Sequence, residues 1–208
     1  MVPAPAPSAT LQQRLLSGLA ASIEEKGLAA TTIADIVGQA RVSKRSFYEM
    51  FASKEQAFLA LYEAATDLGV ASLRNSADAG PTSWDDLVRR LTRTFFGILQ
   101  SQPALTRAHF LEIYSLGEAG LHARRRMIER YAEILRLRLT EHLANDAGGS
   151  VLTHGNLTAL IGGISELALL AVEEPGVNRL PEFEDEAVEF AVRCLGQEVR
   201  QYGAHGIP

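Results

Sequence analysis

A segment between residues 41 and 54 holds the side chains of this sequence that are best suited to bind an anion. Four cations lie in it, namely Arg41, Lys44, Arg45 and Lys54. Glu49 is the only acid among these fourteen residues, so the segment carries a formal charge of +3 in a chain whose net charge is −5. Ammonium, guanidinium and hydroxyl groups donate hydrogen bonds to phosphate oxygens and to the acceptor atoms on base edges. A basic face on an acidic chain favours a protein that docks one end on a polyanion.

Helix-capping signals predict how these donors are positioned. Each expected N-cap is a hydroxyl residue placed just before a short helix-forming stretch, and the three are Thr32, Ser43 and Ser53. Asp35 and Gln56 follow two of these caps at the spacing of a capping box. Phe47 lies where a hydrophobic staple would pack against Val42. The pattern therefore predicts three helix starts within a short segment.

The first two of these helices are separated by only Ala40, Arg41 and Val42. Helices joined by so short a turn cross steeply, which is the helix-turn-helix arrangement. The second helix of such a pair presents its N-terminal turn to base edges in the major groove of DNA. Lys44 and Arg45 lie in that turn, and the helix N-terminus itself favours phosphate. A solvated charged surface is the alternative for each residue alone, but caps, staple and cations in one register favour DNA binding.

The rest of the sequence has a helical pattern and carries no familiar catalytic motif. Apolar residues recur every three or four positions, and runs with strand-like alternation are missing. The single cysteine, Cys194, and five scattered histidines do not have the spacing of metal ligands. No P-loop, nucleophile elbow or HExxH sequence is present. We therefore expect an all-α protein that is not an enzyme and that needs neither a metal nor a cofactor.

Two apolar or uncharged stretches bear on localisation. The most apolar stretch, Leu157–Val172, has 16 residues and contains Glu166, so it is too short and too polar to span a bilayer. The start of the chain, Met1–Ser8, lacks the basic region and apolar core of a signal peptide. We expect a cytoplasmic protein without a membrane partner.

Residues 10–62 resemble the DNA-binding domain of the tetracycline-repressor-like (TetR) family of bacterial regulators. The resemblance rests on a helix that ends at Gly27 and on Thr31-Thr32, Ile33, Ile36, Val42-Ser43, Phe47-Tyr48, Phe51 and Ser53-Lys54-Glu55. It implies an N-terminal three-helix DNA-binding domain with a helix-turn-helix, a linking fourth helix, and a larger helical bundle for ligand binding and dimerisation. About nine helices are expected, divided into a disordered tail (1–9), the DNA-binding domain (10–52), the linking helix (53–74) and the effector-binding and dimerisation domain (75–208).

Two positions depart from the pattern of the family. Arg41 occupies a turn position where glycine is usual, and an arginine with positive φ there costs about 1 kcal/mol. Either the turn differs from that of the family, or a contact of Arg41 with DNA offsets this cost. Arg45 adds a cation where many relatives have glycine. From the residues and the resemblance together, the expected contacts with double-stranded DNA are Thr32, Arg41, Ser43, Lys44, Arg45, Ser46, Tyr48 and Lys54.

The resemblance also implies a homodimer formed by the last two helices. Both carry apolar stripes at helical spacing, and the expected interface residues are Leu160, Ile164, Leu167, Ala171, Val188, Val192, Leu195 and Val199. Such stripes are equally typical of an intrachain core. Because both helices are apolar on more than one side, one face can serve the core and another a second subunit.

An effector cavity is implied in the larger domain. The expected ligand-binding residues are Phe95, Leu99, His109, Phe110, Tyr114, Met127, Tyr131, Ile161 and Glu166. Apolar walls with a few polar groups suit a hydrophobic or aromatic effector. Large side chains at helical spacing also form ordinary cores, so the individual positions are hypotheses.

These features predict a ligand-responsive transcriptional regulator. The favoured hypothesis is a repressor that binds a palindromic operator as a homodimer and is released from DNA by a small-molecule effector. The alternatives are an activator, a module of the same fold that binds DNA nonspecifically, and a protein-interaction module. The ratio of affinities for a palindrome and for random DNA separates specific from nonspecific binding.

Overall fold

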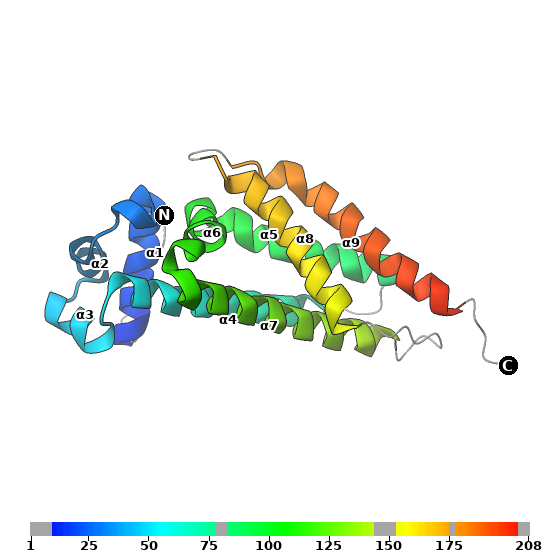
Figure 1. Ribbon diagram of the computed structural model, residues 1–208, viewed down its shortest axis with the longest axis horizontal. Coiled ribbons are helices and arrows are strands. Elements are labelled where there is room, and N and C mark those ends of the chain that lie inside the picture. The colour runs from blue at the N-terminus through cyan, green and yellow to red at the C-terminus, as the bar shows by residue number, and fades with distance from the viewer. Residues whose placement is uncertain (1–9, 78–82, 144–152, 175–177, 204–208) are drawn as a thin grey trace. The chain divides into compact units, whose positions relative to one another are not determined.

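The computed structural model describes residues 10–77, 83–143, 153–174 and 178–203, and these ranges are almost entirely helical (Figure 1). They form α1 (Leu11–Ala30), α2 (Ile33–Ala40), α3 (Lys44–Met50), α4 (Lys54–Ala77), α5 (Trp84–Ser101), α6 (Pro103–Phe110), the 3-10 helix η1 (Glu112–Leu116), α7 (Gly117–Leu143), α8 (His154–Val172) and α9 (Leu180–Gly203). No strand occurs within these ranges, so the all-α expectation is confirmed. The tail expected at 1–9 lies outside the described residues.

Contacts divide the chain into two compact units. The first comprises the described residues up to Thr66 together with Gln102–Arg124, and the second comprises Asp67–Ser101 and the described residues from Arg125 onward. Helices α4 and α7 each run from one unit into the other. In this grouping α6 and η1 belong with the N-terminal helices, whereas the division by sequence placed them in the effector domain.

In the first unit α1 supplies the core against which α2 and α3 pack. Leu15, Leu19 and Ile23 lie one turn apart and are fully buried, and each contributes about 1.5–3 kcal/mol by leaving water. Gly18 lies on the same side, where a Cβ would be only 2.6 Å from the Ile36 carbonyl oxygen. The missing side chain thus lets the backbone of α2 approach α1 closely.

The three predicted N-caps are confirmed. The Oγ atoms of Thr32, Ser43 and Ser53 accept hydrogen bonds from backbone N–H groups three residues later, at 3.3, 3.0 and 3.2 Å. Helix α1 is interrupted at Gly27, whose φ of 77° and ψ of 162° are not helical, so the expected helix stop is also present. Single residues close in sequence therefore determine where these helices begin and end.

The first unit also contains α6, which packs on α1. The backbone N–H of Leu105 donates to Glu24 Oε1 at 2.9 Å. Further along α6, the ring of His109 stacks on that of Tyr62 from α4, with centroids 3.8 Å apart and an interplanar angle of 3°. Both contacts join segments that are distant in sequence.

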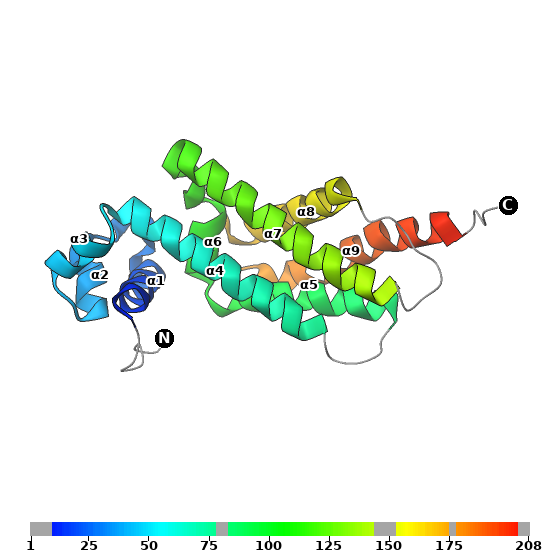
Figure 2. The same cartoon turned by 90° about the horizontal axis from the view of Figure 1, so that it is seen from below.

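The second unit is a bundle of the remaining helices. Helix α9 packs along α5, with an ion pair of 3.0 Å between Arg89 Nη1 and Glu189 Oε1, and it also packs on α8. The C-terminal part of α4 lies beside α7 (Figure 2), where a side chain on Gly69 would collide with the Tyr131 hydroxyl. These helices enclose the apolar core of the unit.

Helix α8 is long and apolar enough to cross a membrane by length and composition alone. Eight of its residues are buried inside the second unit, among them Leu157 and Ala168 with no exposed area. The core helix of a water-soluble domain has the same composition, so packing within the unit accounts for the apolar character of α8.

Candidate functional site

Helix α3 presents its polar side chains away from the core. Phe47 is its buried residue, and its ring lies 5.8 Å from that of Phe51. Lys44 and Arg45 are exposed, and Tyr48 exposes 58% of its surface. The N-terminal turn and outer side of α3 are thus open to a macromolecule that approaches from solvent.

The Arg45 side chain extends into solvent and makes one exposed ion pair. Its Nε lies 3.0 Å from Glu49 Oε1, one turn along α3, and its side chain is 89% exposed. Exposed i,i+4 ion pairs contribute little to stability because water screens them. A base edge or phosphate that offered a better acceptor could therefore draw Arg45 away from Glu49 at small cost.

Ser43 and Ser46 form a small polar cluster at the start of α3. Ser43 Oγ accepts from the Ser46 N–H, and the two hydroxyl oxygens lie 2.9 Å apart. Ser43 therefore acts as a helix cap, whereas, among the described residues, the hydroxyl of Ser46 contacts only that of Ser43. Both lie beside the N-terminal end of α3, where the backbone favours an anion.

Arg41 adopts the left-handed conformation that its turn position suggested. Its φ of 53° is the only positive value among the non-glycine residues that the structure describes. The side chain is exposed and makes no ion pair within the described ranges. Arg41 therefore places an unengaged cation next to α3, in a backbone conformation that L-residues disfavour by about 1 kcal/mol.

Thr32 makes its hydrogen bonds within the chain, at the start of α2. It forms a reciprocal capping box with Asp35, in which the Thr32 hydroxyl donates to Asp35 Oδ2 at 2.6 Å and the Thr32 N–H donates to the same atom at 2.8 Å. The hydroxyl of Thr32, the Lys26 ammonium and the Thr32 N–H hold the pKa of Asp35 well below its usual range. Thr32 is exposed, but its hydroxyl already serves α2.

Lys54, expected to contact a phosphate, has another role in the structure. Its Nζ donates to the backbone carbonyl oxygens of Leu28 and Thr31 at 2.8 and 2.9 Å, with a third contact of 3.5 Å to Ala29. These carbonyls form the end of α1, where the helix dipole favours a cation. The three ammonium donors are thus used within the first unit.

The structure separates the eight expected contacts into two groups. Arg41 and the α3 residues Lys44, Arg45, Ser46 and Tyr48, with the cap Ser43, lie together around the start and outer side of α3. Thr32 and Lys54 serve the ends of α2 and α1. The first group is a compact set of cations and hydroxyls around a helix N-terminus, which can donate hydrogen bonds to phosphates and bases.

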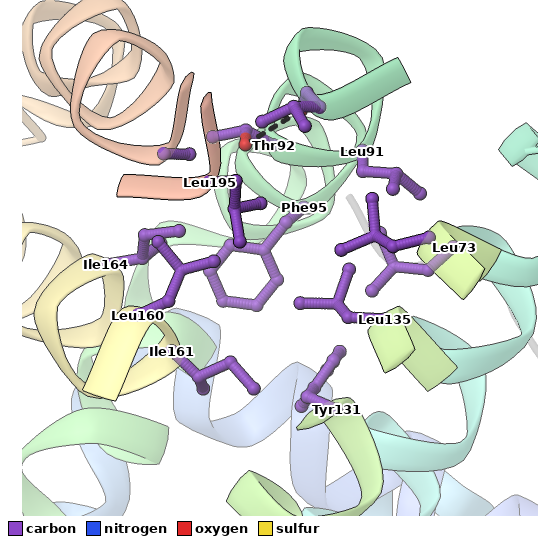
Figure 3. Close-up of a pocket in the computed structure, with 13 residues that line it drawn as sticks. Leu73, Leu91, Thr92, Phe95, Tyr131, Leu135, Leu160, Ile161, Ile164 and Leu195 are labelled. Atoms are coloured by element: carbon purple, nitrogen blue, oxygen red, sulfur yellow. Dashed lines mark hydrogen bonds between the residues drawn. The ribbon is translucent and has the colours of Figure 1, made fainter. Parts of the chain in front are cut away.

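A cavity of about 40 Å³ lies in the second unit. Its walls come from α4, α5, α7, α8 and α9. The lining residues, drawn as sticks in Figure 3, are Leu73, Val88, Leu91, Thr92, Phe95, Tyr131, Leu135, Leu139, Leu160, Ile161, Ile164, Ala191 and Leu195. Phe95 and Tyr131 meet edge to face with centroids 5.5 Å apart. The cavity is an apolar gap between helices.

The two polar side chains on the cavity wall, Thr92 and Tyr131, bring no charge into it. The Thr92 hydroxyl donates to the Val88 carbonyl oxygen of its own helix at 3.0 Å. Burial raises the pKa of Tyr131 to about 12, so its phenol stays neutral. The wall therefore offers apolar contact and carries no charge.

Three of the nine expected ligand-binding residues line this cavity, namely Phe95, Tyr131 and Ile161. Leu99 and Met127 are buried elsewhere in the second unit. His109, Phe110 and Tyr114 belong to the first unit, where burial lowers the pKa of His109 to about 3. Glu166 is exposed on α8 and does not reach the cavity.

The cavity residues that sequence reasoning missed are small or aliphatic. On α5 they follow the i, i+3, i+4 stripe of Val88, Leu91 and Thr92, which continues into Phe95. That stripe was a usable signal. Leu73 and Leu135 gave no such signal, because their helices α4 and α7 carry apolar residues on several sides.

The structure places most of the expected dimer stripe inside the second unit. Leu160, Ile164 and Leu195 line the cavity, and Ala171 and Val188 are buried. Leu167 and Val192 are half-buried, and the side chain of Val199 lies outside the described residues. The outward side of these helices carries other residues, including Leu170, which is 40% exposed.

Comparison with known proteins places the N-terminal helices in a family. The sequence model described as "Bacterial regulatory proteins, tetR family" matches residues 15–61. This range covers most of α1, all of α2 and α3, and the start of α4. No curated protein matches the chain in sequence.

Solved structures share the whole fold at low sequence identity. The fatty acid degradation regulator FadR from Bacillus halodurans is 16% identical, with a TM-score of 0.73 over 89% of this chain and 96% of its own. The transcriptional regulator FadR from Bacillus subtilis, solved in complex with stearoyl-CoA, is 18% identical, with a TM-score of 0.70 over 86% and 96%. A TetR-family transcriptional regulator from Streptomyces coelicolor is 19% identical, with a TM-score of 0.66 over 91% and 99%. The match over residues 15–61 identifies a DNA-binding domain of the tetR family of bacterial regulatory proteins at the N-terminus, and the chain as a whole shares the fold of these solved transcriptional regulators.

Proposed function

We propose that this chain is a transcriptional repressor that binds a palindromic DNA operator as a homodimer, in the cytoplasm, and that an apolar effector releases it. The observation that carries the proposal is the exposed N-terminal turn of α3, which offers Lys44 and Arg45 beside Arg41. Arginine and lysine donate to the two acceptors of guanine in the major groove. Arg45 is the residue we expect to read a base.

A homodimer is required because one recognition helix reads only a half-site. The outward sides of α8 and α9 support this part of the proposal. Leu170 is exposed there, and Leu167 and Val192 are half-buried. Replacing Leu170 by glutamate should then favour the monomer, because a charge would be buried against the partner. A monomeric mass for the unmodified protein at micromolar concentration, measured by light scattering, would contradict dimerisation.

The cavity supports an apolar effector with no charged group inside the second unit. An acyl chain meets this requirement, and the FadR neighbour from Bacillus subtilis was solved with stearoyl-CoA. We therefore propose a long-chain acyl compound as the first effector class to test. At about 40 Å³, the cavity is far below the roughly 300–1,000 Å³ of ligand pockets.

The small cavity suggests how an effector could release DNA. An acyl chain can enter only if the helices around the cavity move apart, so the effector selects an expanded conformation. If that conformation binds the operator less well, linkage requires effector and operator to weaken each other's binding by the same factor. A 100-fold effect corresponds to about 2.7 kcal/mol of coupling.

The operator part of the proposal is tested by selecting duplexes from a random pool with effector-free protein. We expect an inverted repeat whose half-sites are about 34–36 Å apart, one turn of DNA. Arg45→Ala should weaken binding to the selected duplex and relax base preference at one position in each half-site. Glu49→Ala is the matched control on α3, because it removes the ion-pair partner of Arg45 and leaves the guanidinium. Equal losses for Arg45→Ala on selected and random DNA would count against base reading.

The effector part is tested with two variants on α7. Leu135 lines the cavity, whereas Leu137, two residues on, is exposed. Leu135→Phe should fill the cavity and make operator binding insensitive to long-chain acyl-CoA, while Leu137→Phe should respond like the unmodified protein. Fluorescence anisotropy of the labelled operator measures both. If the two variants respond alike, the cavity is not the effector site, and free fatty acid and aromatic compounds provide the further arms of the comparison.

A further inference from the structure

The turn between α2 and α3 is held by a side chain from outside the helix-turn-helix. Arg14, in the first turns of α1, donates from Nη2 to the carbonyl oxygen of Ala40 at 2.9 Å and to that of Arg41 at 2.6 Å. These two carbonyls belong to the peptide planes on either side of the Arg41 Cα. One nitrogen bonded to both therefore restrains both backbone dihedral angles of Arg41.

The restraint acts on the residue whose backbone conformation is unfavourable for a side chain other than glycine. The N–H of Arg41 donates to Gly38 O at 3.2 Å and that of Val42 to Val37 O at 3.0 Å, which is the Schellman pattern of a helix that ends in a left-handed residue. Glycine is favoured at this position, and Arg41 stands there with a φ of 53°. The Arg14 guanidinium satisfies carbonyls that the Schellman bonds leave open, and its charge suits the C-terminal end of α2.

A second observation shows that the register of α1 against α2 is fixed at the same place. Gly18 lies one turn after Arg14, and a Cβ there would lie 2.9 Å from the backbone nitrogen of Ala40. The α1 backbone thus touches the last turn of α2, and Arg14 reaches from this contact to the turn. Helix α3 begins two residues after Val42, so the backbone dihedral angles of Arg41 set the direction of α3.

We infer that Arg14 is a positioning residue for DNA recognition. By clamping Arg41 in the left-handed conformation it fixes the direction of α3, and so the placement of Lys44 and Arg45, without touching DNA itself. The inference rests on the proposed operator binding. It predicts that the hydrogen bonds from Arg14 are needed for operator binding only because residue 41 is not glycine.

A double-mutant cycle tests this prediction. The four proteins are the unmodified chain, Arg14→Gln, Arg41→Gly and the double variant, and the probe is the duplex selected from the random pool. Arg14→Gln should weaken operator binding by about tenfold, the order expected for losing charge-assisted hydrogen bonds, and should weaken random-DNA binding much less. In the Arg41→Gly background the same substitution should cost no more than about threefold, because glycine adopts positive φ freely. Loss of the Arg14 charge is common to both backgrounds and cancels in the cycle.

Amide hydrogen exchange provides a readout that needs no DNA. Arg14→Gln should speed exchange at Val42, whose N–H closes the turn, more than at Ile23 in the middle of α1. Gln12→Ala, an exposed substitution on α1, should change neither exchange nor binding. If Arg14→Gln does not fold but the double variant does, the compensation is shown by folding itself.

Three results would overturn the inference. They are equal losses from Arg14→Gln with and without the Arg41→Gly substitution, unchanged operator binding in Arg14→Gln, and failure of both Arg14→Gln and the double variant to fold. Absence of any selected duplex for the unmodified chain would instead defeat the proposed function, and the exchange at Val42 would still decide the role of Arg14.

Discussion

At the scale of single residues, a basic side chain is either left to solvent or bound within the fold, according to which acceptors the chain places near it. Arg45 and Lys54 are both basic residues in the segment that looked suited to an anion. Arg45 extends into solvent with one weak partner. Lys54 directs its ammonium to carbonyl oxygens at the end of α1. Charge counting treats them alike, whereas the hydrogen bonds distinguish them.

Lys54→Ala should act on stability more than on DNA. The substitution leaves the carbonyls of Leu28 and Thr31 without their cation, and hydrogen bonds to charged groups contribute about 1.5–3 kcal/mol. Water can replace part of this at a half-buried site, so we expect a loss of about 1–2 kcal/mol. Denaturant midpoints measure it. The salt dependence of operator binding should keep its slope; a slope shallower by about one, with unchanged stability, would restore Lys54 as a phosphate contact.

How much of this site could be predicted follows from how local each signal is. The caps Thr32 and Ser43 act on backbone three residues away, so sequence spacing was sufficient to predict them. For Arg41 the sequence left open whether the turn differs or keeps a positive φ, and the structure has the positive φ. The acceptors of Lys54 lie 23 and 26 residues back along the chain, and the clamp by Arg14 spans 26 and 27. No periodicity encodes such pairs.

At the scale of elements, α6 depends on a side chain from α1 for its N-terminal end. Gln102, at the cap position, makes no side-chain cap, and Pro103 follows it. Glu24 Oε1 accepts from the Leu105 N–H instead, and a carboxylate there also suits the positive end of the helix. A helix of eight residues is too short to be stable on its own. Helix α6 therefore owes its order to contacts with its neighbours.

Glu24→Ala should loosen α6 without unfolding α1. Losing an N-terminal cap costs about 0.5–2 kcal/mol, and the effect should appear as faster amide exchange at Leu105 and Thr106. Glu24→Gln keeps an acceptor oxygen and should retain most of the protection. Glu25→Ala, an exposed neighbour, is the control. Protection at Leu105 that is the same in Glu24→Ala and Glu25→Ala would show that α6 does not depend on this cap.

The elements also show where periodicity stops being informative. Helix α8 is apolar around most of its circumference, so its pattern could not tell the side facing the cavity from the side facing outward. Leu160 and Ile164, expected at a dimer interface, line the cavity. The difference arises from which partner helices cover each side. That arrangement is a property of the assembled bundle and is not contained in any one helix.

At the scale of the whole molecule, burial of His109 couples folding to pH. The ring stacks on Tyr62, and burial lowers its pKa from 6.5 to about 3. As the pH falls from about 6.5 to about 3, the unfolded chain binds a proton that the folded chain does not. Stability is therefore lost over this window, at up to about 1.4 kcal/mol per pH unit.

His109→Phe should flatten that dependence, because phenylalanine keeps a ring to stack on Tyr62 and has no proton to bind. Between pH 7 and 5, where most carboxylates remain ionised, chemical denaturation of the variant should show a weaker loss of stability than the unmodified protein. His122→Gln, which changes an exposed histidine, should keep the original pH profile. If His109→Phe and His122→Gln lose stability in parallel, the buried ring is not the group responsible.

Binding to an operator as a dimer has a consequence that a single half-site does not. With roughly four phosphate contacts per subunit, a dimer neutralises about eight, and log K should fall with log salt at a slope near −7. Leu170→Glu, which we expect to give monomers, should bind with a slope of about −4, because only one half-site is then occupied. Titrations of the selected duplex at several salt concentrations measure both slopes, and light scattering confirms the state of each protein. If the monomeric variant retained the full slope, the counted contacts would belong to one subunit, and the symmetric arrangement of two α3 helices on DNA would be wrong.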